Sequence, residues 1–308
     1  MKTNPLSLTD RLSGALWGHL IGDATGVPYE FLAAAEINEI HFGATGTHRQ
    51  PPGTWSDDGA LMLALLDSLT EAGFDPEDQG QRMLAWWVDG AYTPDGVAFD
   101  IGNTTRRSLI HLQAGLPAIE AGVADVTANG NGSLMKILPL ALYDPESSDA
   151  ELTARACLTS RITHGHPRAQ VACALYCLVV RQLLNDEEPA EALALAQLGL
   201  RSYLEESHQE EFLVALDFLL AWPERTGSGV VWDAFWSAWD SFTGATSYQQ
   251  TIERAIALGD DTDTTAAIAG GLAGVYWGLE NIPLAWRQGL RGQRVATPLI
   301  EAFLAQVL

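Results

Sequence analysis

The clearest indication of the fold of this chain is the stretch GDDTDTTAAIAGGLAGVYWG, residues 259–278. Behind its acidic start, apolar and small residues recur at helical spacing over 264–277, which predicts a buried helix. Glycine occupies every fourth position at Gly270, Gly274 and Gly278. Because a glycine inside a helix costs about 1 kcal/mol relative to alanine, this spacing indicates a helix that another backbone approaches closely.

The same glycine spacing occurs near the N-terminus, at Gly14, Gly18 and Gly22, across a helical segment over 12–20. Tight packing explains the glycines in both helices. Acidic residues adjoin both glycine helices, and the acids are the more informative feature.

Eight further segments place apolar residues at i, i+3 and i+4, which predicts helices. They are 61–69, 83–88, 152–158, 169–184, 190–204, 212–222, 231–242 and 252–258. Thr9-Asp10 and Thr264-Thr265 provide start signals for the first and last helices. A strand-like piece at 39–42 carries little weight. The segments at 43–53, 92–103 and 129–133 are predicted loops, and no linker divides the chain. We therefore expect an all-α fold with a single domain over residues 1–308.

Composition excludes several classes of protein. The 308 residues carry 39 acidic and 17 basic side chains, for a formal net charge of −22. Such a field repels phosphate backbones and anionic lipids, so we expect no nucleic-acid partner and no membrane partner. No segment reaches the roughly 18–20 apolar residues of a membrane span, and the N-terminus does not resemble a signal peptide. A soluble, cytoplasmic protein is expected.

The three cysteines, Cys157, Cys173 and Cys177, form no CxxC pair. We interpret Cys173 and Cys177 as small core residues on one helix. A zinc site would need more cysteine or histidine at ligand spacing than this sequence offers.

The acidic start of the opening stretch exceeds what helix capping needs. Asp260, Asp261 and Asp263 place three carboxylates within four residues, just before an apolar helix, although one acid, such as Asp263, would be enough for a cap. Burying several carboxylates without compensation would cost many kcal/mol or force protonation. A divalent cation removes this problem, and Mg²⁺, Mn²⁺ and Ca²⁺ all prefer oxygen ligands.

The stretch GTWSDDGALML, residues 53–63, has the same design. Ser56, Asp57 and Asp58 again put a hydroxyl and paired acids at the start of an apolar helix. Two such half-sites could converge on one or two metals. A metal pair about 3.5–4 Å apart can orient a nucleophile and stabilise charge.

The acidic stretch also matches parts of two other sequence patterns. An EF-hand loop starting at Asp261 would need Gly and Glu where Ala266 and Leu272 stand, so it fails. Residues 261–265 also match the DxDxT pattern of haloacid-dehalogenase-type phosphatases. That interpretation needs a preceding strand and a long α/β domain, whereas 252–258 has helical spacing.

Together, six segments resemble the ADP-ribosylglycohydrolase family, in the family's order and over residues 14 to about 280. They are GALWGHLIGDATGVPYEF (14–31), GTWSDDGALMLALLDSL (53–69), DIGNTTRRSL (100–109), NGNGSLMKILPLAL (129–142), ITHGHP (162–167) and GDDTDTTAAIAGGLAGVYWG (259–278). The resemblance implies a compact, all-α orthogonal bundle with a binuclear metal cleft that holds two divalent cations, Mg²⁺ or Mn²⁺. It also implies hydrolysis of the bond between C1″ of ADP-ribose and a protein side chain or small-molecule acceptor.

The resemblance assigns roles position by position. The implied metal ligands are Ser56, Asp57, Asp58, Asp261, Asp263 and Thr264. Glu30 matches a glutamate beside the metals, a candidate acid/base or substrate gate; a ligand aspartate, Asp58 or Asp261, could accept the proton instead. Asn131, Gly132 and Ser133 match a loop that holds ribose and diphosphate, and His164 matches a histidine near the nucleotide. Independently, the Asn-Gly-Asn-Gly-Ser loop offers the backbone N–H groups and small bulk that a pyrophosphate favours.

The sequence departs from the family at two positions. Lys136 replaces an arginine, which keeps the charge but loses bidentate geometry, so we assign it no substrate contact. Asn129 stands where some relatives place an adenine-stacking ring. Asp100 falls in a loop that faces the substrate guanidinium in the arginine-specific bacterial branch. We therefore expect arginine linkages to be preferred over serine linkages.

The leading prediction is a metal-dependent hydrolase, acting as a monomer on an ADP-ribosylated protein or ADP-ribose conjugate. One alternative is a non-catalytic ADP-ribose reader, which the intact ligand set disfavours. The other is a two-metal phosphoesterase acting on a nucleotide or sugar phosphate.

Overall fold

The described part of the chain, residues 6–308 of a computed structural model, is built of α-helices without any β-strand. The helices are α1 (Leu8–Gly26), α2 (Asp57–Ala72), α3 (Pro76–Asp89), α4 (Asn103–Gln113), α5 (Ala118–Ala121), α6 (Leu138–Tyr143), α7 (Asp149–Arg161), α8 (Pro167–Leu184), α9 (Pro189–Glu206), α10 (Glu210–Leu220), α11 (Val231–Thr243), α12 (Tyr248–Ile256), α13 (Thr262–Trp277), α14 (Leu284–Gly289) and α15 (Gln293–Val307). The prediction of an all-α fold is therefore confirmed.

Each predicted helical segment is helical over most of its length, while five helices were not predicted: α4, α5, α6, α14 and α15. Three of the five span six residues or fewer, which is too short to develop a periodic pattern. The predicted start signals were wrong by a few residues. Helix α1 begins at Leu8, because the Ser7 side chain accepts a hydrogen bond from the amide of Asp10 (3.1 Å). Helix α13 begins at Thr262.

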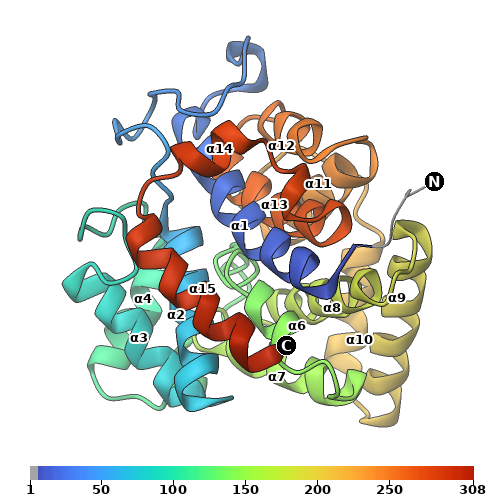
Figure 1. The fold of residues 1–308 in the computed structure, drawn as a ribbon. Coiled ribbons are helices and arrows are strands. Elements are labelled where there is room, and N and C mark those ends of the chain that lie inside the picture. The colour runs from blue at the N-terminus through green and yellow to red at the C-terminus, as the bar shows by residue number, and fades with distance from the viewer. Residues whose placement is uncertain (1–5) are drawn as a thin grey trace.

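Helices α1 and α13 lie side by side at the centre of the molecule (Figure 1). Their glycines face one another in antiparallel order: Gly14 lies against Gly274 and Gly18 against Gly270. A Cβ atom at Gly18 would lie only 2.5 Å from the carbonyl oxygen of Gly270. The two rows of glycines thus form one close contact between α1 and α13. Any larger side chain at these positions would push the two helices apart.

This contact brings the end of α1 against the start of α13. The hydroxyl of Thr262 donates a hydrogen bond to the carbonyl of Gly26 (2.9 Å), and a Cβ at Gly26 would overlap the backbone of Asp263. The acidic start of α13 is therefore held beside the loop that carries Glu30.

Buried apolar side chains from most helices form one continuous cluster. Helix α8 is almost wholly buried within it, including Cys173 and Cys177, as predicted for small core residues. Within residues 6–308, none of the helices combines the length and hydropathy needed to span a bilayer.

The close approach of α1 and α13 leads to a stability prediction. Gly18→Ala should lower the free energy of unfolding by about 1–3 kcal/mol, because the new methyl group meets backbone that cannot rotate away. Gly199→Ala in α9 is the matched control. The nearest atom to a Cβ there is a carboxylate oxygen of Asp149, at 3.1 Å, and that side chain can move. Urea denaturation of both variants distinguishes the two; equal stability of Gly18→Ala and wild type would contradict the packing argument.

Candidate functional site

The acidic starts of α2 and α13 converge. Asp57 and Asp58 lie in the first turn of α2, and Asp263 lies in the first turn of α13. The hydroxyl of Thr264 lies 3.4 Å from Oδ2 of Asp58, to which it donates a hydrogen bond. Ser56 is the N-cap of α2, and its hydroxyl accepts a hydrogen bond from the amide of Asp58 (3.3 Å).

The acids of α13 do not cap their helix. Asp261 occupies the N-cap position, but its side chain accepts no capping hydrogen bond. Asp263 lies inside the helix, where its Oδ1 accepts a hydrogen bond from the amide of Thr264 (2.9 Å). Asp263 is therefore not the capping acid that the sequence allowed for. Its other carboxylate oxygen, Oδ2, has no hydrogen-bond partner within the described part of the chain.

Burial makes this cluster electrostatically unusual. Asp57, Asp58 and Asp263 are at most 4% exposed. Their burial, reinforced by the neighbouring carboxylates, raises the pKa of each of the three well above its ordinary value. Oδ1 of Asp58 and Oδ2 of Asp263 are buried without any hydrogen-bond partner. Unpartnered, crowded oxygen ligands of this kind suit a hard divalent cation.

Asp23 ties α1 to the start of α2 and was not predicted as a site residue. It is fully buried, and its carboxylate accepts hydrogen bonds from the amides of Ser56 (2.9 Å) and Gly59 (2.7 Å). Burial raises the pKa of Asp23 to about 7, although these hydrogen bonds oppose the rise. The sequence feature that could have indicated Asp23 as a site residue is its position directly after Gly22, one of the regularly spaced glycines of the first helix.

Glu30, His48 and Asp100 form a second cluster at the same place. Nε2 of His48 contacts the Glu30 carboxylate and lies 3.8 Å from Oδ1 of Asp100. The Glu30 carboxylate also lies with those of Asp261 and Asp263, where one oxygen from each falls within 4.8 Å of the others. Sequence reasoning missed His48, because its loop shows no ligand spacing.

A cavity of about 360 Å³ opens onto these groups. Eight of the predicted site residues line it: Glu30, Asp57, Asp100, Asn131, Gly132, His164, Asp261 and Thr264. Ser56, Asp58 and Asp263 do not line the cavity and are buried. The hydroxyl of Ser133 points elsewhere, into contact with Ser160 (3.0 Å) and Cys173.

The glycine loop at 129–133 forms one wall of the cavity. The side-chain amide of Asn131 donates a hydrogen bond to Oδ2 of Asp261 (2.8 Å), which joins this loop to the acidic cluster. Nζ of Lys136 donates to the carbonyl of Gly132 (2.9 Å) and to Thr163 (2.8 Å). Lys136 is buried, which lowers its pKa to about 8. Lys136 therefore supports the loop from behind.

His164 lines the cavity beside Gly132. Its Nδ1 lies 3.0 Å from the hydroxyl of Thr163. Burial lowers the pKa of His164 to about 3, so its ring is neutral near pH 7.

This chain is similar to known proteins both in sequence and in structure. A sequence model described as ADP-ribosylglycohydrolase matches residues 4–308. An ADP-ribosylarginine hydrolase, Tri1, of Pseudomonas putida (strain GB-1) is 31% identical over 92% of this chain and 74% of its own length. The ADP-ribosyl-dinitrogen reductase glycohydrolase of Rhodospirillum rubrum is 28% identical over 97% of both chains. A solved structure titled ADP-ribosylglycohydrolase-related protein complex superposes with a TM-score of 0.79 at 32% identity, covering 98% of this chain and 99% of its own. The resemblance and the orthogonal-bundle fold that it implied are confirmed.

Proposed function

Because the chain belongs to the ADP-ribosylglycohydrolase family, we propose that it is an enzyme that hydrolyses the bond between ADP-ribose and an arginine side chain of a protein. Hydrolytic release of ADP-ribose from an acceptor is the family's reaction, and the choice of arginine is our addition. One observation carries the proposal: the acidic starts of α2 and α13 converge beside a cavity whose wall includes the Asn131-Gly132 loop.

We assign two divalent cations, Mg²⁺ or Mn²⁺, to the acidic cluster. The residues that would hold them are Ser56, Asp57, Asp58, Asp261, Asp263 and Thr264. The unpartnered oxygens of Asp58 and Asp263 support this assignment. When bound, such cations neutralise the crowded carboxylates, polarise the ribose oxygens and make water more acidic.

Hydrolysis adds water across the bond from C1″ to the acceptor: hydroxide joins C1″, and a proton goes to the leaving nitrogen. Glu30 is the side chain that we assign to this proton movement. It lines the cavity, and its contact with His48 orients the carboxylate. Burial and the nearby charges of Asp100 and Asp261 raise its pKa far above the ordinary value, so Glu30 holds a proton readily. Asp58 and Asp261 are the other candidates for this role.

The substrate's ribose and diphosphate would lie along the glycine loop. Gly132 and the side-chain amide of Asn131 lie at the cavity wall, and the neutral ring of His164 lies beside them. The inward hydroxyl of Ser133 supports a role for that residue through its backbone only. The absence of a ring at Asn129 leaves the adenine contact unassigned.

Asp100 supports the choice of arginine. It lines the cavity on the loop between α3 and α4, and its carboxylate is 18% exposed. A guanidinium placed there would form a charge-assisted pair, worth about 1.5–3 kcal/mol. We expect kcat/KM for an ADP-ribosyl-arginine peptide to exceed that for an ADP-ribosyl-serine peptide by about tenfold or more. Asp100→Asn should lower the arginine value about 10- to 100-fold and change the serine value much less.

Asp95→Asn is the matched control, because Asp95 lies in the same loop but pairs with Arg291 at the surface (2.7 Å). ADP-ribose release from both peptides is measured by chromatography. Equal turnover of the two linkages, or preference for serine, would overturn the arginine assignment. Release of inorganic phosphate in place of ADP-ribose would favour a phosphoesterase.

We also propose that residues 1–308 form one domain that acts as a cytoplasmic monomer on ADP-ribosylated proteins. One continuous cluster of buried side chains supports a single domain, and the net charge of −22 disfavours a nucleic-acid partner.

A further inference from the structure

The segment between α10 and α11 connects two parts of the site that are distant in sequence. The carbonyl of Gly227 accepts a hydrogen bond from the amide of Asp261 (2.9 Å). Two residues further on, the carbonyl of Gly229 accepts one from the amide of Asn131 (3.0 Å). Asn131 in turn donates its side-chain amide to Asp261. The segment 226–229, here called the bridging loop, therefore fixes the backbone of both residues.

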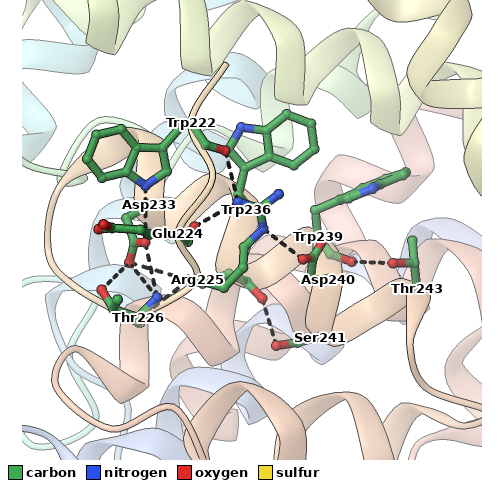
Figure 2. Close-up of polar contacts among 12 residues, drawn as sticks. Trp222, Glu224, Arg225, Thr226, Asp233, Trp236, Trp239, Asp240, Ser241 and Thr243 are labelled. Carbon is green, nitrogen blue, oxygen red and sulfur yellow. Dashed lines mark hydrogen bonds and ion pairs between the residues drawn. The ribbon is translucent and has the colours of Figure 1, made fainter. Parts of the chain in front are cut away.

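Asp233 holds the bridging loop from the other side (Figure 2). This carboxylate lies in the first turn of α11 and is 1% exposed. Its Oδ2 accepts hydrogen bonds from the amide of Ser228 (2.8 Å) and from the hydroxyls of Thr226 (2.9 Å) and Ser228 (3.1 Å). Its Oδ1 accepts one from the amide of Thr226 (3.1 Å). One side chain thus satisfies most polar hydrogens of the loop.

Ser237 completes the arrangement one helical turn later. Its hydroxyl accepts a hydrogen bond from the amide of Gly227 (3.1 Å). Three successive amides of the bridging loop, at residues 226–228, therefore point at α11, while the carbonyls of Gly227 and Gly229 point at the site. Although burial would raise the pKa of Asp233, the hydrogen bonds from Ser228 and Thr226 keep that pKa below its ordinary value. The carboxylate is therefore ionised near pH 7.

We propose that Asp233 is a positioning residue: by fixing the bridging loop it sets the backbone positions of Asp261 and Asn131, and thereby the affinity of the acidic cluster for a divalent cation. The inference rests on the proposed function in that Asp261 is taken as a cation ligand. Groups that orient ligands in this indirect way typically contribute 10- to 100-fold to metal affinity.

Asp240 provides a matched control on the same helix. Its carboxylate accepts a hydrogen bond from Nε of Arg225 (2.7 Å), whose guanidinium stacks over Trp236 at 4.9 Å (Figure 2). This ion pair holds the residues that precede the bridging loop and contacts neither Asp261 nor Asn131. Asp233→Asn and Asp240→Asn therefore make the same chemical change at two anchors of one connection.

Two measurements test the proposal on the full chain. Amide hydrogen exchange of the EDTA-treated protein needs no metal and no turnover. In Asp233→Asn we expect the amides of Asp261 and Asn131 to exchange at least about tenfold faster, while α8 is unchanged. Calorimetric titration with Mn²⁺ should show affinity reduced about 10- to 100-fold. In Asp240→Asn both readouts should stay within about twofold of wild type.

Ser237→Ala keeps the test decisive if Asp233→Asn fails to fold. It removes the acceptor for the Gly227 amide and a long hydrogen bond from the Ser237 hydroxyl to Oδ2 of Asp233 (3.4 Å). It leaves the hydrogen bonds from Thr226 and Ser228 to Asp233 in place, so we expect smaller changes in the same two readouts. Exchange and Mn²⁺ affinity equal to those of Asp240→Asn in every folded variant would overturn the proposal. A wild-type protein that binds no Mn²⁺ would instead refute the proposed cation site, and the exchange result would still decide the role of Asp233.

Discussion

Replacing Asp57 with alanine is expected to reduce ADP-ribose release by roughly 10³-fold, equivalent to about 4 kcal/mol of transition-state stabilisation. Asp57 lines the cavity at the start of α2 and is nearly buried. Its removal takes one proposed ligand from the cation site. The same substitution relieves repulsion among the remaining carboxylates, so the metal-free variant should be at least as stable as wild type. Release assays with added Mn²⁺, run beside Mn²⁺ titrations, measure the loss of activity and of cation binding, and thermal unfolding of the EDTA-treated variant measures its stability.

Glu30→Gln is the comparison that separates cation binding from proton transfer. Glutamine keeps the size of Glu30 but cannot exchange a proton, so release should fall about 10²- to 10⁴-fold while Mn²⁺ still binds. Asp57→Ala should lose both Mn²⁺ binding and release. Mn²⁺-dependent release that survives in Asp57→Ala would show that the site lies elsewhere. Loss of Mn²⁺ binding in Glu30→Gln would make Glu30 a ligand instead of an acid/base.

Removing the cations should make stability fall as the pH rises. Burial raises the pKa of Asp57, Asp58 and Asp263 well above normal, and that of Asp23 to about 7. In an unfolded chain such groups titrate near pH 4. Between about pH 4 and pH 7 the folded, metal-free protein therefore binds more protons than the unfolded chain, and its free energy of unfolding decreases with pH.

Thermal unfolding of EDTA-treated protein measures this effect. We expect Tm to fall from about pH 5 to about pH 8 and Mn²⁺ to restore it by on the order of 10 °C at the higher pH, with a much smaller gain at the lower one. Asp263→Asn should flatten the decline, because one buried titrating group is gone. A metal-free Tm that does not change over this range would contradict the electrostatic account of the cluster.

Local pattern was sufficient for ten of the fifteen helices of residues 6–308 and for picking out the two acidic stretches. Periodicity at 3.6 residues depends only on neighbours along the chain, which is why 169–184 and 264–277 were recognisable without a structure. Likewise, GTWSDD and GDDTDTT each show, within a few residues, more acidic side chains before an apolar helix than capping requires. Helices α5, α6 and α14 are too short to carry such a pattern.

Which of these elements meet depends on the packing of the whole chain. The sequence contained both rows of glycines, but their contact joins Gly18 to Gly270, more than half the chain apart. Asp23 and His48 became site residues through such contacts, and the hydroxyl of Ser133 turned away from the cavity because Ser160 lies behind it. Sequence periodicity reports which face of a helix is buried. It does not report what that face is buried against, because packing partners are selected by shape and charge across the whole fold.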